Sequence, residues 1–167
     1  MALGKTALGG LMFESRQRLA REIAGLLHGM RAEAEGRYAC LVDHERVLFE
    51  SPKDSDPEFE PLRKKLLSET PALFALPRHM KDEDPLEEDL FEDWEQDDFF
   101  LAFLNGRIAF VLACPHAEPL REALRRPLET LADRLFRYDP IYRIDDRGKG
   151  LLAGNAQLDI MVLGRCV

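Results

Sequence analysis

The residues of this chain that are best placed to do chemistry are a cysteine and a histidine two positions apart, Cys114 and His116. Alternate residues of a strand share a face, so the thiol and the imidazole could lie together, and a histidine can activate a cysteine nucleophile. The same side chains could form half of a Cys/His metal site. A small cysteine buried at the end of a strand explains the pair without any reaction, and we favour this interpretation. An enzyme that uses Cys114 and His116 is kept as an alternative hypothesis.

Other polar residues do not complete a motif. Asp54 with Asp56, and Asp82 with Asp84, have the alternating acids of a calcium loop, but the glycine and the closing glutamate of such a loop are missing. The sequence contains neither a serine nucleophile elbow nor a glycine-rich dinucleotide loop. No spacing gathers the remaining histidines, which are His28, His44 and His79. We therefore expect no catalytic residue, no metal site and no cofactor.

The segment DDFFLAFLNGRIAFVLACPH, residues 97–116, predicts the two strands that would position Cys114 and His116. Asn-Gly favours a two-residue type I′ turn, so we place the turn at Asn105 and Gly106. This register puts six bulky side chains on one face of the hairpin and mostly small ones on the other. The bulky set consists of three facing pairs, which are Phe103 with Ile108, Leu101 with Phe110, and Phe99 with Leu112.

Neither face of this hairpin is polar, because the second face also carries apolar pairs such as Phe100 with Val111. An antiparallel sheet with one solvated face would alternate apolar and polar residues. We therefore expect the hairpin to lie centrally in a sheet that is covered on both sides, with Leu101 and Phe110 buried.

Hydrophobic periodicity predicts helices before and after the first strands. Apolar residues recur at helical spacing in residues 11–35, and Gly36 suits the end of that helix. A second helix should begin near Pro57 or Pro61, where proline is tolerated in the first turn. Pro71 should then break or bend this helix, because proline lacks the backbone N–H that a helix interior needs.

Pro119 opens a third helix, and Pro127 falls inside it, so we expect either a kink or two abutting helices. Strands are predicted at residues 38–43 and 46–50, and a last strand within residues 158–167. The apolar stripe of the third helix consists of leucines, which are Leu120, Leu124, Leu128, Leu131 and Leu135.

This order of elements predicts an α+β fold with a central antiparallel sheet and helices on both faces. The first and third helices should share one side of the sheet, and the second helix should cover the other. At 167 residues, we expect a single domain, residues 1–167. Residues 82–98 would be an acidic insertion in this domain, and residues 139–167 a C-terminal extension.

The net charge of −8 is concentrated in one stretch, which we call the acidic segment, residues 82–98. This segment holds eleven acidic side chains and no lysine or arginine, so that without it the net charge would be +3. No basic patch is dense enough to indicate a nucleic-acid site. No apolar run reaches the roughly 20 residues of a membrane helix. We expect neither nucleic acid nor membrane as a partner.

The acidic segment admits two interpretations. It could be a solvated loop, or it could be a docking segment for a basic partner, because Leu86, Leu90, Phe91 and Trp94 are interleaved at helical spacing. Under the second interpretation, Phe91 and Trp94 would contact the partner.

Cysteine usage indicates the compartment. Cys40, Cys114 and Cys166 are an odd number of cysteines without metal-type pairing, which favours a reducing environment. The first residues lack the sustained apolar region of a secretion signal. We therefore expect a cytoplasmic protein.

The stretches YACLVDHERVLFES and FFLAFLNGRIAFVLACPHAEPLREALRRPLETLADRLF, with a helix between them, resemble the roadblock/LC7 family. That family has a helix, two strands, a helix, further strands and a final helix. Its first hairpin is similar to Leu41-Val42-Asp43 followed by Val47-Leu48-Phe49 here. The likeness covers roughly residues 11–138. The related longin, profilin-like and GAF folds remain alternatives.

The resemblance implies a noncatalytic homodimer that binds or regulates a small Ras-like GTPase, or that serves as a scaffold of a motility or polarity complex. In such proteins the sheets often join edge to edge, and the second helices form the partner surface. Carried onto this chain, that surface would include Arg63, Lys64 and Leu67. The alternative is a sensory domain of the GAF or PAS type, in which the bulky face of the sheet would line a small-molecule pocket.

Overall fold

The computed structural model describes residues 3–52, 57–81, 97–105, 107–143 and 159–163 of the chain. Its centre is a five-stranded antiparallel sheet with the strand order β2-β1-β4-β3-β5. The α+β class, with a central antiparallel sheet and helices on both faces, is therefore confirmed. The strands are β1 (Tyr38–Val42), β2 (Val47–Ser51), β3 (Asp98–Asn105), β4 (Ile108–Cys114) and β5 (Asp159–Leu163).

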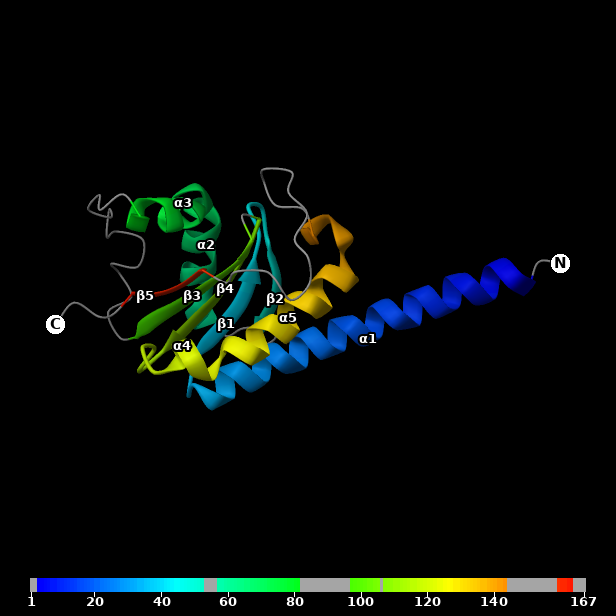
Figure 1. Ribbon diagram of the computed structural model, residues 1–167, viewed down its shortest axis with the longest axis horizontal. Coiled ribbons are helices and arrows are strands. Elements are labelled where there is room, and N and C mark those ends of the chain that lie inside the picture. The colour runs from blue at the N-terminus through cyan, green and yellow to red at the C-terminus, as the bar shows by residue number, and fades with distance from the viewer. Residues whose placement is uncertain (1–2, 53–56, 82–96, 106, 144–158, 164–167) are drawn as a thin grey trace.

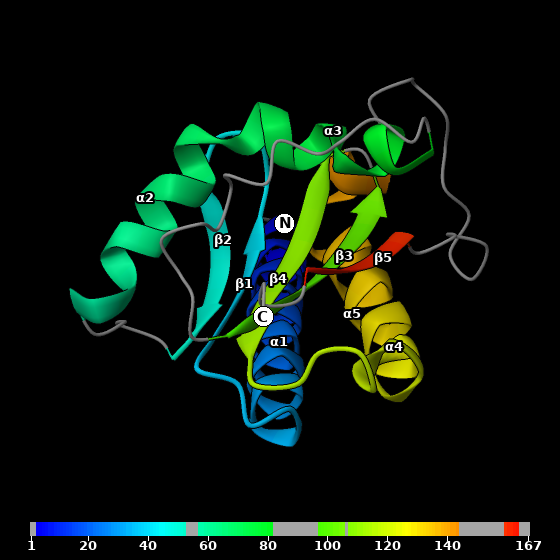
Figure 2. The same cartoon turned by 90° about the vertical axis from the view of Figure 1, so that its left-hand side faces the viewer.

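The helices form two layers. As predicted, the first helix and the last pair of helices cover one face of the sheet, and the middle pair covers the other (Figures 1 and 2). None of the helices described is both long and apolar enough to cross a bilayer. The helices are α1 (Leu3–Glu33), α2 (Glu60–Ser68), α3 (Thr70–Lys81), α4 (Leu120–Ala123) and α5 (Arg125–Tyr138), with short 3-10 turns η1 (Pro57–Phe59) and η3 (Pro140–Arg143).

Each layer encloses its own hydrophobic core. Burying one large aliphatic or aromatic side chain contributes about 1.5–3 kcal/mol to the free energy of folding. Each layer buries several such side chains, and this burial stabilises the sheet between the two layers. On one face, α1 and α5 pack against the sheet through Ile23, Leu27, Met30, Leu128, Leu131 and Leu135. On the other face, α2 and α3 pack against it through Leu62, Leu66 and Leu73.

The hairpin of β3 and β4 lies inside the sheet, and Leu101 and Phe110 are fully buried, as predicted. The predicted register is wrong by one residue. Leu101 pairs with Val111, and Ala102 pairs with Phe110. Leu101 and Phe110 therefore lie on opposite faces of the sheet. The six bulky residues are divided between them: Phe99, Leu101 and Phe103 face α2 and α3, whereas Ile108, Phe110 and Leu112 face α1 and α5.

The side chain of Asn105 explains this shift. Its Oδ1 accepts hydrogen bonds from the backbone N–H groups of Arg107, at 2.7 Å, and Ile108, at 3.2 Å. Asn105 pairs with Ile108, and the ladder slips by one residue between Phe103 and Asn105. An Asn side chain that bonds the backbone two residues on is a common turn device. The extra residue of the resulting bulge, Leu104, changes which residues share a face.

The first helix begins earlier than predicted, at Leu3, and ends at Glu33. Gly36 was expected to supply the left-handed residue at its end, but Glu35 adopts that conformation, with φ of 53°. Gly36 is needed for a different reason. A Cβ atom at this position would lie 2.6 Å from Leu112 Cδ1 and 3.1 Å from the Ala113 carbonyl oxygen, so any other residue would have to displace the buried Leu112 side chain.

Pro71 and Pro127, the two prolines expected to interrupt helices, mark helix starts. α2 ends at Ser68, and Pro71 lies in the first turn of α3. The second predicted outcome for Pro127 is confirmed, because α4 and α5 are separate helices that abut at Leu124. Pro127 lies in the first turn of α5, where the N–H that proline lacks would have no acceptor within α5.

The C-terminal extension contributes to the sheet. β5 pairs antiparallel with β3 and forms one edge, which confirms the predicted last strand. Its central residue, Met161, is buried against the core under α2 and α3.

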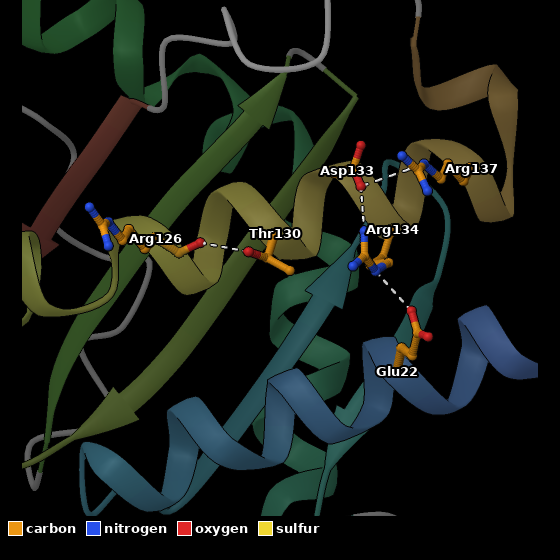
Figure 3. Close-up of polar contacts among 6 residues, drawn as sticks. All are labelled: Glu22, Arg126, Thr130, Asp133, Arg134 and Arg137. Atoms are coloured by element: carbon orange, nitrogen blue, oxygen red, sulfur yellow. Dashed lines mark hydrogen bonds and ion pairs between the residues drawn. The ribbon is translucent and has the colours of Figure 1, made fainter.

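Charged side chains join α1 to α5 on their outer surface (Figure 3). Arg134 Nε lies 2.8 Å from Glu22 Oε2, and the same guanidinium also contacts Asp133. Arg137 Nε lies 3.5 Å from the same Asp133 oxygen, Oδ2. These four charges connect the two helices in a chain of ion pairs, which stabilises their antiparallel contact.

Candidate functional site

The residues predicted to bind a partner, Arg63, Lys64 and Leu67, all lie on α2. This helix packs on the sheet through Leu62 and Leu66, which are both buried. The three predicted residues lie next to these buried leucines on the helix, so their side chains lie at the edge of the packed face or on the outer surface of α2.

Arg63 is held in place by a carboxylate of the sheet. Glu50 Oε2 accepts hydrogen bonds from the Tyr38 hydroxyl, at 2.7 Å, and from Arg63 Nε, at 3.0 Å, and Arg63 Nη2 lies 2.9 Å away. The Arg63 side chain is 27% exposed, so its guanidinium reaches the surface but is not free to move. The hydrogen bond to Glu50 raises the pKa of Arg63 further. Burial, the neighbouring Cys40 and Glu50 raise the pKa of Tyr38 far above its usual range, so the phenol stays protonated and donates.

The other two residues of this surface differ in exposure. The Lys64 side chain is 76% exposed, and its Nζ lies 3.5 Å from Glu60 Oε1 one turn earlier. Leu67 is half-buried and packs against the core under α2 and α3. We call these three residues the α2 surface, which combines a fixed cation, an exposed cation and an apolar rim.

The other predicted contacts, Phe91 and Trp94, lie outside the described residues. The last two residues of the acidic segment are described, and they are held in the fold. The side chain of Asp97 is 4% exposed, and its Oδ2 lies 3.7 Å from Arg37 Nε. Asp98 Oδ2 accepts a hydrogen bond from the N–H of Ala117, at 3.1 Å. A solvated loop is therefore the wrong description for these two residues.

Cys114 and His116 are placed very differently from each other. Cys114 is completely buried in the core under α1 and α5, whereas His116 is exposed. Burial, together with the negative charges of Asp98 and Asp97, raises the pKa of the Cys114 thiol to about 11. A nucleophilic cysteine needs a lowered pKa and access to substrate. This environment therefore gives the enzyme hypothesis no support.

One cluster that sequence reasoning missed lies between α1 and β2. Arg31 Nε donates to Ser51 Oγ, at 2.8 Å, and His28 Nδ1 lies 3.4 Å from the same oxygen. Arg31 Nη2 lies 3.2 Å from His28 Nδ1. Because a guanidinium only donates, His28 Nδ1 is the acceptor in its contact with Arg31.

A serine beside an imidazole is the pairing of a nucleophile with its base. Here Ser51 is 4% exposed, and Arg31 already occupies the imidazole nitrogen that would take the proton. The cluster therefore joins α1 to the end of β2 and is not arranged for catalysis. No motif could have revealed it, because His28 and Ser51 are 23 residues apart.

The sheet face proposed for a small-molecule pocket is covered by helices. Phe99, Leu101 and Phe103 form one core cluster with residues of α2 and α3, including Leu62 and Leu66. Among the residues that the structure describes, no three His, Cys, Asp or Glu side chains are grouped to hold a metal ion.

Comparison of the chain with protein-family models, with curated proteins and with solved structures finds no match in any of the three.

Proposed function

We propose that this chain is a noncatalytic, cytoplasmic homodimer that regulates a small Ras-like GTPase or serves as a scaffold for it. The α2 surface, with Arg63, Lys64 and Leu67, would contact this partner. The observation that carries the proposal is the position of Arg63, which Glu50 and Tyr38 fix at the surface of the helix.

A fixed arginine suits a binding surface for two reasons. Ordering a flexible side chain costs binding energy, and Arg63 has already been ordered by the fold. Arginine is also enriched among the residues that dominate interface energies. The exposed Lys64 beside it can bind an acidic group of the partner, and the half-buried Leu67 offers an apolar contact.

The arrangement of elements supports the same proposal. α1, the β1–β2 hairpin, α2 with α3, the β3–β4 hairpin and α4 with α5 follow the order that the roadblock/LC7 resemblance implies. β2 is an edge of the described sheet, so its outer backbone groups are available for edge-to-edge pairing with a second copy. The buried thiols of Cys40 and Cys114 fit a noncatalytic role.

The experiment uses the full chain and a panel of purified small GTPases, each loaded either with GDP or with a non-hydrolysable GTP analogue. Biolayer interferometry measures binding, and light scattering measures the mass of the free chain. Lys64→Glu should weaken binding about tenfold, because it places a negative charge at the rim of the contact. Arg126→Glu is the matched control, since Arg126 is exposed on α5, on the other face of the sheet.

The proposal predicts a dimeric mass, nucleotide-dependent binding to at least one GTPase, and a loss with Lys64→Glu but not with Arg126→Glu. A monomer that binds no GTPase in either state would overturn it. Equal losses with both variants would show that the α2 surface is not the contact.

A further inference from the structure

The N-terminal turns of α1 extend beyond the part of the helix that the fold supports. Among the α1 side chains whose burial the structure describes, from Ser15 on, the buried ones begin at Ile23, and α5 ends at Tyr138, whose ring lies 4.6 Å from the Arg16 guanidinium carbon. Figure 1 shows α1 continuing outward past α5 and the sheet. At 1.5 Å per residue, the turns before Arg16 add about 20 Å. We call residues 3–15 the N-terminal arm.

The sequence of the N-terminal arm is apolar and poor in charge. Its only charged residues are Lys5 and Glu14. The apolar positions do not form a single stripe, because Leu11 and Phe13 are about 200° apart around an ideal helix. A groove on a protein usually takes one stripe of a helix. The apolar residues of the arm are Leu3, Ala7, Leu8, Leu11, Met12 and Phe13.

The N-terminal arm is a poor helix by itself. Gly4, Gly9 and Gly10 each lower helix stability relative to alanine, because glycine loses more backbone freedom than other residues when a helix forms. Helices of this length are marginal in water even with good helix formers. An apolar environment would complete this helix, because backbone hydrogen bonds must then be made within the segment.

Basic residues of α1 follow the N-terminal arm, at the point where the helix reaches the rest of the fold. Arg18 and Arg21 are exposed, and neither makes an ion pair with any other residue that the structure describes. With Lys5, Arg16 and Glu14, they give residues 3–21 a net charge of +3 in a chain whose total is −8. The rest of the chain therefore carries −11, and this end of α1 stands apart from it in charge.

We propose, contrary to the expectation that a membrane is not a partner, that the N-terminal arm inserts into the interfacial region of a lipid bilayer with anionic headgroups, and that Arg18 and Arg21 bind those headgroups. An apolar helical segment followed by cations is held at such a surface both by burial of apolar area and by attraction to negative lipids. The bilayer fits better than a protein groove, because the arm lacks the single apolar stripe that a groove takes. α2 lies on the other face of the sheet from α1, so this inference does not depend on the α2 surface.

The test mixes the full chain with vesicles of phosphatidylcholine alone or of phosphatidylcholine with phosphatidylglycerol, and measures bound protein by flotation. The chain should float with the anionic vesicles and not with the neutral ones, and binding should fall as salt rises. Circular dichroism should show more helix when anionic vesicles are added.

Three double variants separate the contributions. Arg18→Glu with Arg21→Glu should reduce binding to anionic vesicles at least tenfold, because each arginine near the surface contributes attraction to the negative lipids. Leu8→Glu with Leu11→Glu should abolish it. Arg125→Glu with Arg126→Glu makes the same change of charge on exposed residues of α5, and it should leave binding unchanged. Urea unfolding of each variant establishes that the body is folded.

Four results would overturn the proposal. The first is a chain that stays unbound at low salt, and the second is equal binding to neutral and anionic vesicles. The third is an equal loss in the α5 control. The fourth is a fall from dimer to monomer in Leu8→Glu with Leu11→Glu when no vesicles are present, because the arm would then pair with a second copy of this chain.

Discussion

At the scale of single residues, Glu50 is the residue on which the α2 surface depends. It accepts hydrogen bonds from both Tyr38 and Arg63, and its side chain is 22% exposed. Glu50→Ala would leave the Tyr38 hydroxyl and the Arg63 guanidinium without this partner. We expect a loss of about 1–3 kcal/mol in the free energy of unfolding, measured by urea titration.

Glu60→Ala is the control for this prediction. Glu60 pairs with the exposed Lys64, and such surface pairs contribute about 0–1 kcal/mol. If the two variants lost the same small amount of stability, the Glu50 network would be no stronger than an ordinary surface pair.

The thiols provide a second prediction at this scale. Burial raises the pKa of Cys114 to about 11 and that of Cys40 to about 12. In a Cys166→Ser chain, iodoacetamide at neutral pH should modify neither thiol until urea unfolds the protein, as mass spectrometry can measure. Rapid, stoichiometric alkylation of Cys114 that His116→Ala abolishes would instead show an activated thiolate.

The same pKa values determine how these thiols affect stability at high pH. An unfolded thiol ionises at about pH 8.5, whereas the folded ones stay protonated to higher pH. Their contribution to stability is therefore fully present below that pH. It is lost as the pH rises toward 11, because ionisation then favours the unfolded chain.

For single residues, the sequence predicted only those properties that follow from a residue's type and its local position. The burial of Cys114 followed from its place at the end of an apolar strand. The contacts of Arg63 with Glu50, and of His28 with Ser51, depend on how α2 and α1 lie against β2, which no local spacing encodes.

At the scale of elements, the central hairpin sets the stability of the sheet. Leu101 is completely buried between β4, β5 and the helices α2 and α3. Leu101→Ala should cost about 2–5 kcal/mol, because it removes buried methyl groups and leaves a cavity. Ile141→Ala is the control, since Ile141 is 55% exposed, and thermal unfolding followed by circular dichroism compares the two. A loss below 1 kcal/mol at Leu101 would contradict its place in the core.

The edge strand β5 allows a separate prediction. Met161 is the one buried residue of β5, and it pairs with Leu101 of β3. Met161→Ala should therefore lower stability by about 2–5 kcal/mol, whereas Asp159→Ala at an exposed position should have little effect. Equal unfolding midpoints for these two variants and the parent chain would show that β5 is not needed for the fold in solution.

The elements themselves were predictable because their signals are local. Helix periodicity, prolines in first turns and apolar runs placed the helices and strands to within a few residues, apart from the earlier start of α1. The register of the hairpin was not predictable from alternation, because both of its faces are apolar and either register would bury them. The hydrogen bonds of the Asn105 side chain decided it.

At the scale of the whole molecule, the layered architecture could be predicted from hydrophobicity alone. A hairpin with two apolar faces requires cover on both sides, and the structure provides it with α1, α4 and α5 on one face and α2 and α3 on the other. The function could not be predicted in the same way. The α2 surface depends on contacts between elements, and partner recognition depends on a second molecule.

Charge is the other property that belongs to the whole molecule. The acidic segment holds eleven of the 31 acidic residues, and residues 3–21 hold a net +3. Asp97 and Asp98, at the end of the segment, are tied to Arg37 and to the N–H of Ala117. A deletion that tests the segment should therefore stop at residue 96, so that these contacts survive.

We predict that the chain is a homodimer in which the acidic segment contacts a second, more basic partner. Aromatic residues dominate interface energies, so Trp94 and Phe91 should anchor this contact. Trp94 is the only tryptophan, and its fluorescence can therefore report the binding of a lysine- and arginine-rich peptide. Binding should shift the emission to shorter wavelength, and Phe91→Ala should weaken it about tenfold although the charge is unchanged.

Measuring peptide binding at different salt concentrations distinguishes a contact anchored by aromatic residues from one held by charge attraction alone. The screening length falls from about 10 Å at 0.1 M to about 3 Å at 1 M, so the charge contribution should nearly vanish while an aromatic anchor persists. A chain that lacks residues 82–96 should keep its dimeric mass in light scattering and lose the peptide. If the emission of Trp94 never shifts, and if Phe91→Ala binds as tightly as the parent, attraction between charges explains the contact and neither aromatic residue is an anchor. A monomeric mass at every accessible concentration would contradict the dimer itself, whatever the acidic segment does.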